Sequence, residues 1–184
     1  MKESLFNKMM LVFTIFTFAA CKGGEIYPII PSIEVETAYV IRAGNGEDSL
    51  IGVRIKYKDG DGDIGLEDGD TLPPFNAIIL PDDPAKRNIN FYYNNLHIDY
   101  LEKKDGEYKH VVAEFTGDTL RRQLRVMSLT PEGKFKAIRG TIDAQFAPSP
   151  YPDRADTIRL RLLLVDRALH VSNAVETPDI ILNR

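Results

Sequence analysis

The chain has 184 residues and carries 23 Lys and Arg against 27 Asp and Glu, a formal net charge of −4 at pH 7. Nucleic-acid-binding domains usually display a basic patch, and this sequence has none, so we expect no nucleic-acid partner. The single cysteine, Cys21, excludes an intrachain disulfide. Stability must then come from a buried core, for which a chain of this length suffices in one domain.

The first twenty residues have the pattern of a secretory signal. Lys2 and Lys8 give a basic start, residues 9–18 form an apolar run, and Ala19 and Ala20 are small. The apolar run is shorter than the roughly 20 residues that span a bilayer. We therefore predict that residues 1–20 are a cleaved signal peptide.

Cys21 follows the small residues directly. The run Phe18-Ala19-Ala20-Cys21 resembles the lipobox of bacterial lipoproteins, which implies a lipid on Cys21 and attachment to the membrane through that lipid. Residues 21–31 contain two glycines and two prolines and are predicted to be a lipidated tether. The alternative is an ordinary secretory signal followed by a chance cysteine.

Alternating apolar and polar residues predict strands from the tether onward. Apolar residues stand at every second position over residues 51–57 and, except for Thr37, over residues 33–41, with Gly44, Asn45 and Gly46 between the two runs. This period is typical of half-buried strands. The two runs are predicted to pair antiparallel.

The dipeptide Asp105-Gly106 predicts a tight hairpin over residues 96–115. With those two residues at the turn, the residue numbers of each cross-strand pair add up to 211. The predicted apolar pairs are Leu96 with Phe115, Ile98 with Ala113 and Tyr100 with Val111, and Glu102 meets Lys109.

Further strands are predicted over residues 136–146, 157–165 and 179–182, with a short strand within 75–80 and extended structure over 119–127. Many short strands separated by Gly, Pro and Asn are typical of a sandwich. The predicted fold is therefore all-β: a single immunoglobulin-like β-sandwich of about seven to nine antiparallel strands over residues 32–184.

The loop between Asp59 and Asp70 concentrates six carboxylates and four glycines in twelve residues. Calcium takes six to eight oxygen ligands from flexible acidic loops of this kind. An EF-hand is not expected, because a strand precedes the loop and Ile64 stands where that motif needs glycine. We predict a calcium site at the acidic loop; the alternative is a solvated Asp/Gly turn. The candidate ligands in the loop are Asp59, Asp61, Asp63, Glu67, Asp68 and Asp70.

The sandwich topology brings a second loop to the same end. In an immunoglobulin-like fold the loop after the second strand, the loop over residues 166–173 and the entry into the first strand share one end. Asp166 is therefore predicted as a further ligand, and Asn173 as a weaker candidate. The alternative for both is turn chemistry, since Asp and Asn side chains hydrogen-bond their own backbone in loops.

The lipobox, the segment 58–65 (KDGDGDIG) and the closing segments 165–173 and 177–182 together resemble a group of outer-membrane lipoproteins of Bacteroidota. This resemblance implies an outer-membrane location and an immunoglobulin-like sandwich. It implies no activity, and the side of the membrane that the domain faces stays open.

No catalytic residues are predicted. His97 and His110 share a face of the predicted hairpin, but four residues, about 13 Å, separate them along it, and dense carboxylates on a flexible loop lack the rigid mount of catalytic acids. Aromatic residues at 91–93, 100 and 151 are expected to pack in the core and loops; a carbohydrate- or peptide-binding surface is the alternative. We predict a non-catalytic binding or accessory module of an outer-membrane system. The alternative is a metal-dependent enzyme acting on glycans or peptides.

Overall fold

The computed structural model describes residues 26–79, 88–113, 117–130, 136–148 and 156–183. Almost all regular structure in these residues is strand, and the helix η3 (Phe91–Tyr93) is a single 3-10 turn. The described residues contain no helix with the length and apolar character needed to cross a bilayer. The predicted signal peptide and Cys21 lie outside the described residues and stay predictions.

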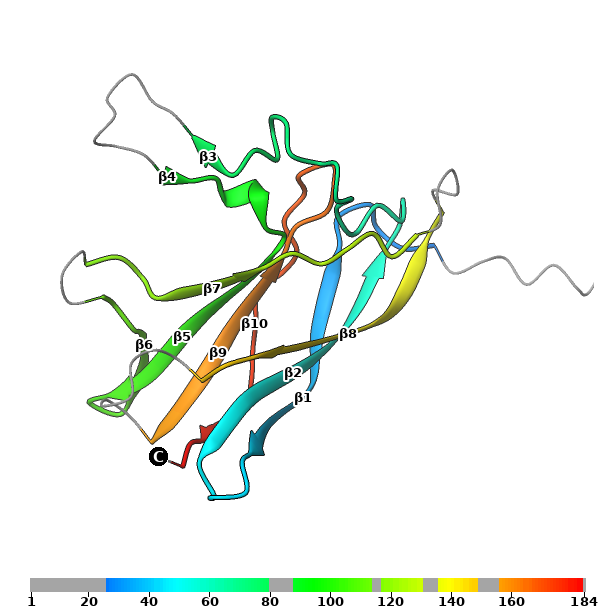
Figure 1. Ribbon diagram of the computed structural model, residues 1–184. Coiled ribbons are helices and arrows are strands. Elements are labelled where there is room, and N and C mark those ends of the chain that lie inside the picture. Colours follow the sequence, from blue (N-terminus) through cyan, green and yellow to red (C-terminus); the bar gives the residue numbers. More distant parts are fainter. Residues whose placement is uncertain (1–25, 80–87, 114–116, 131–135, 149–155, 184) are drawn as a thin grey trace, which may run out of the picture.

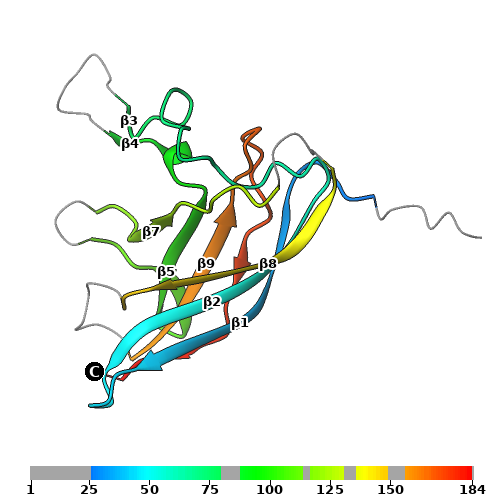
Figure 2. The same ribbon diagram turned by 45° about the vertical axis from the view of Figure 1, so that its right-hand side comes forward.

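Two sheets pack face to face (Figures 1 and 2). The first sheet has three strands in the order β1-β2-β8, and the second has six, with the path β10-β9-β5-β6 and with β11 beside β9 and β7 beside β5. Their bounds are β1 Ser32–Arg42, β2 Asp48–Asp59, β5 Leu96–Lys104, β6 Glu107–His110, β7 Arg121–Leu124, β8 Ile138–Phe146, β9 Thr157–Leu164, β10 Val175–Glu176 and β11 Ile180–Ile181.

The strand order is that of an immunoglobulin-like sandwich. Strands β1, β2 and β8 stand where strands A, B and E stand in that fold, and β5, β9 and β10 stand for C, F and G. A separate two-stranded ribbon, β3 (Ile78–Ile79) with β4 (Asn88–Ile89), projects beside the second sheet (Figure 1). The predicted all-β sandwich is confirmed.

Period-two alternation explains how the core forms. Ile51, Val53 and Ile55 of β2 point inward and are fully or almost fully buried, and the residues between them lie on the other face. From the second sheet, every second residue of β5 and β9 meets them. The inward-facing residues of those two strands are Leu96, Ile98, Tyr100, Ile158, Leu160, Leu162 and Leu164.

The predicted hairpin is confirmed next to its turn. Glu102 pairs with Lys109, and the amide of Val111 donates to the carbonyl of Tyr100 at 2.8 Å. Asp105 and Gly106 both have positive φ, as this type of two-residue turn requires.

Farther from the turn the predicted register is wrong. Leu96 pairs with Leu124 and Ile98 pairs with Arg122, both on β7. The cause is a second reversal of the chain: the amide of Ala113 donates to the carbonyl of Asp118, so the strand leaves β5 after Val111 and returns as β7. Phe115 lies outside the described residues.

We predict a large loss of stability for Leu162→Ala. Leu162 has no exposed surface, and truncating a buried Leu costs about 2–5 kcal/mol through lost burial and the cavity left behind. Leu72→Ala is the matched control, because Leu72 is 76% exposed and such surface changes stay within about 0.5 kcal/mol. Chemical denaturation of the two variants measures the difference. Similar values for both would contradict the assigned core.

Candidate metal centre

Strand β2 ends at Asp59, whose side chain is completely buried. The chain then crosses beneath the segment that enters β1. A Cβ atom on Gly60 would collide with the carbonyl oxygen of Tyr27, so only glycine permits this approach. The ammonium group of Lys58 lies 5.6 Å from the centre of the Tyr27 ring. The residues before β1 therefore lie directly against the start of the acidic loop.

Two glycines allow the loop to curl tightly. Gly62 has φ +75° and Gly65 has φ +108°, a region that favours glycine. Neither has room for a side chain, since a Cβ at Gly62 would strike the carbonyl of Lys136 and one at Gly65 would strike the carbonyl of Met127. Ile64 between them is fully buried and anchors the loop to the core.

The second acidic segment is the tight turn after β9. Val165 and Val171 face each other as an antiparallel bridge, with Asp166 at the start of the turn between them. Oδ1 of Asp166 accepts a hydrogen bond from the His170 amide at 2.8 Å, and Leu169 has φ +72°. The hydrogen bond between the Asp166 side chain and the backbone of its own turn, expected as the alternative role, is therefore present, and it fixes the position of the carboxylate.

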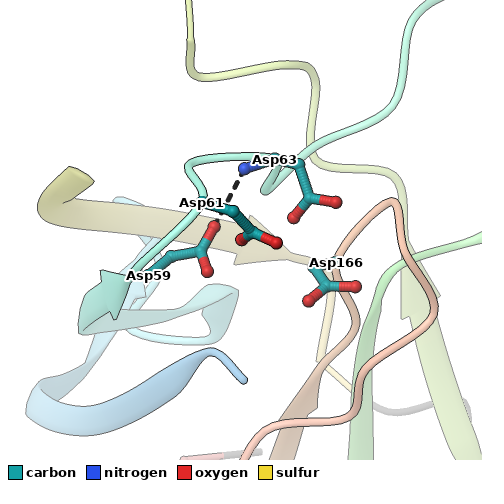
Figure 3. A group of neighbouring side chains, drawn as sticks. All are labelled: Asp59, Asp61, Asp63 and Asp166. Carbon is teal, nitrogen blue, oxygen red and sulfur yellow. Dashed lines mark hydrogen bonds between the residues drawn. The ribbon is translucent and has the colours of Figure 1, made fainter. Parts of the chain in front are cut away.

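Four carboxylates converge where the two segments meet (Figure 3). They belong to Asp59, Asp61, Asp63 and Asp166, and one oxygen from each lies within 4.8 Å of the others. The backbone amide of Asp63 donates to Oδ2 of Asp59 at 2.9 Å. The amide of Ala168 donates to Oδ2 of Asp63, also at 2.9 Å, and so joins the two loops.

In three of these carboxylates one buried oxygen has no hydrogen-bond donor among the residues that the structure describes: Oδ1 of Asp59, Asp61 and Asp63. Buried polar atoms are normally hydrogen-bonded, and an unpaired buried charge is costly. These three atoms have the chemistry of ligands for a hard cation. The residues present therefore fit a metal ion that binds through oxygen.

The electrostatics of the four carboxylates reflect their burial. Burial raises the pKa of Asp59 to about 7, with a further increase from Asp61 and Asp63. Burial and the neighbouring Asp166 raise the pKa of Asp63 to about 6. The pKa of Asp166 is also raised by burial, although its hydrogen bonds with His170 act in the opposite direction. The protein thus holds the charged forms at a cost that a bound cation would offset.

The other three predicted ligands lie outside this four-carboxylate group. Asp70 accepts a hydrogen bond from the Glu67 amide at 2.8 Å and pairs with Arg167 at 2.7 Å. The guanidinium of Arg125 donates to the carbonyls of Glu67 and Asp70. Asp68 is exposed. This half of the loop is held by arginines and its own backbone.

Asn173 has a different role from the one considered for it. Its side chain makes two hydrogen bonds of 2.9 Å with the backbone of Ile33, one to the amide and one to the carbonyl. This pair, the Asn173 clamp, ties the start of β1 to the loop before β10. The amide oxygen expected as a weak ligand is already occupied by the Ile33 amide.

His170 is a neighbour of the site that the sequence reasoning missed. Its Nδ1 lies 2.8 Å from Oδ2 of Asp166, and this hydrogen bond raises the pKa of the imidazole. The spacing of four residues within one turn was the available signal. His97 lies elsewhere, buried and stacked on Phe91 with ring centres 3.9 Å apart.

Comparisons with protein-family models, with curated proteins and with solved structures find no match.

We predict that the melting temperature in metal-free buffer falls as the pH rises from about 4 to about 7. The folded pKa values of Asp59 and Asp63 are raised above the ordinary value of 3.8. The folded state therefore binds protons more tightly than the unfolded state in this window, and the stability that protonation provides is lost as the pH rises.

Asp59→Asn isolates the effect, because the amide has no charge and its oxygen still accepts from Asp63. The melting temperature of this variant minus that of the wild type should increase with pH across the same window. A difference that does not change with pH would show that Asp59 titrates normally.

Proposed function

We propose that this protein is a non-catalytic lipoprotein of the outer membrane, anchored through Cys21, and that a calcium ion stabilises its sandwich domain at the anchor end. The observation that carries the calcium site is the convergence of four carboxylates, three of which keep a buried oxygen that no donor of the described residues reaches. Within this proposal the domain serves as a binding or accessory module for an outer-membrane protein partner.

The donor set favours calcium over other common ions. Calcium accepts several carboxylates at once in flexible geometry, whereas magnesium usually keeps most of its waters and binds one or two carboxylates. Zinc prefers nitrogen and sulfur ligands. All four side chains at this site offer oxygen, and the nearest imidazole, His170, is hydrogen-bonded to Asp166.

The position of the site supports a structural role for the ion. Asp59 and Asp166 are buried, while a catalytic ion needs an open position for water and substrate. Asp63 receives hydrogen bonds from Arg167 and Ala168 of the other loop, one to its carbonyl and one to its side chain. An ion at this point would join the two loops beside the residues that lead into β1.

We predict that calcium raises the stability of a soluble chain of residues 25–184. Binding to the folded state alone adds RT ln(1 + [L]/Kd), about 2.7 kcal/mol at a hundredfold excess over Kd. Thermal melting with calcium and with chelator measures this gain.

Asp61→Asn should raise the melting temperature in chelator, because one repelling charge is removed, and should abolish most of the calcium response. Asp68→Asn is the matched control, since it removes one charge from an exposed residue of the same loop and should leave the response intact. Equal melting temperatures with and without calcium in the wild type would reject the site.

The anchor gives a separate prediction. Stable membrane attachment requires more than one acyl chain, as a triacylated cysteine provides. Cys21→Ser should therefore move the protein from the membrane fraction to the soluble fraction of fractionated cells. Retention of the variant entirely in the membrane fraction would contradict the lipid anchor without bearing on the calcium site.

A further inference from the structure

A groove runs along the outer edge of β7. Its cavity has a volume of about 610 Å³, and four consecutive residues, 120–123, line one side of it. Successive residues of a strand point to opposite faces, so a cavity that touches all four follows the edge of the strand. Figures 1 and 2 show this edge facing away from β5, with the β3–β4 ribbon beyond it.

The backbone of β7 offers hydrogen-bonding groups along this edge. Tyr100 of β5 donates its amide to the carbonyl of Leu120. Because polar groups alternate between the two edges of an antiparallel strand, the N–H and C=O of Arg121 and Gln123 point away from β5. Among the residues that the structure describes, no strand pairs with them. Open edges of this kind accept a further strand.

The opposite wall of the groove is apolar. Ile78 and Ile89 pair across the β3–β4 ribbon and line the cavity together with Tyr93. The exposed fractions of Ile78 and Ile89 are 48% and 67%. These two isoleucines lie opposite each other on one face of the ribbon and form a small apolar patch beside an open strand edge.

The groove also carries a cation, Arg122, that no acidic residue neutralises within the described part of the chain. Arg121 is bound by Asp99 through two hydrogen bonds. Arg122, by contrast, lies 5.7 Å from the Phe146 ring and 3.5 Å from the carbonyl of Ala147. In the described part of the chain, no carboxylate pairs with it. An occupant of the groove would meet a half-buried positive charge there.

We propose that this groove binds an extended peptide segment of a protein partner, which adds to the edge of β7 as a further strand. Its backbone pairs with Arg121 and Gln123, apolar side chains contact Ile78 and Ile89, and an acidic side chain reaches Arg122. Four residues of strand span about 14 Å, the length of a short recognition segment. This inference rests on the proposed function and names the class of partner that the binding module takes. None of the residues that line the groove is a candidate metal ligand.

Two variants of Gln123 separate backbone pairing from side-chain contact. Gln123→Pro removes the amide that faces the groove, and proline is tolerated where the N–H faces away from the sheet. Gln123→Ala is the matched control, because both variants lose the side-chain contact with Asn94 while alanine keeps the N–H. Arg122→Gln removes the charge.

The probe is a displayed library of random octapeptides, selected on the purified full chain in saturating calcium. Enriched peptides should alternate apolar residues with polar ones and carry an acidic residue. Measured by fluorescence anisotropy, their affinity should fall at least tenfold for Gln123→Pro and for Arg122→Gln. For Gln123→Ala it should stay within about twofold. A cooperative thermal transition near the melting temperature of the wild type shows that each variant is folded.

Three results would overturn the inference. In the first, selection on the wild type enriches no peptide that selection on Gln123→Pro does not also enrich. In the second, the enriched peptides bind Gln123→Pro as tightly as they bind the wild type. In the third, the protein self-associates and Gln123→Pro abolishes this, which would assign the strand edge to a second copy of the chain. A calcium response that persists in any of these cases leaves the proposed metal centre standing, so the two can fail separately.

Discussion

The stability of the sandwich at the end where the chain enters β1 depends on the mutual repulsion of four carboxylates that are held close together. Asp59 lies at the last position of β2, and Asp166 follows β9 after a single residue, Val165, so neither carboxylate can move away without moving a sheet. Asp63 binds the two loops together through backbone amides. Hydrogen bonds thus hold the two loops together, while repulsion between their carboxylates pushes them apart. A bound cation would turn that repulsion into attraction and leave the hydrogen bonds unchanged.

Much of the fold could be predicted because burial imposes a period of two on half-buried strands. That signal located β1, β2, β8 and β9. It could not locate the reversal after Ala113, which depends on a backbone pairing between Val111 and Leu120. A turn dipeptide specifies register only as far as both strands continue, and nothing local to Asp105 and Gly106 indicates where β6 leaves β5.

The site was predictable to the extent that spacing and topology determine it. The spacing of two residues, with glycines between, predicted that Asp59, Asp61 and Asp63 share one side of the chain, and the order of strands added Asp166. In the structure a tight turn at Gly62 brings them together. Composition could not separate these four from Glu67, Asp68 and Asp70. Asp70 instead contacts Arg167, and Arg125 holds the backbone. Those contacts join residues far apart in the chain.

The Asn173 clamp has a mechanical consequence. A pull on residues 26–31 enters the domain at the start of β1 and acts along that strand. The hydrogen bonds between β1 and β2 run across the strands, so the load shears many bonds together instead of opening them one at a time. Asn173, in the loop before β10, adds two hydrogen bonds at Ile33, the second residue of β1. Tension at this end would therefore first extend residues 26–31 and only then unfold the domain.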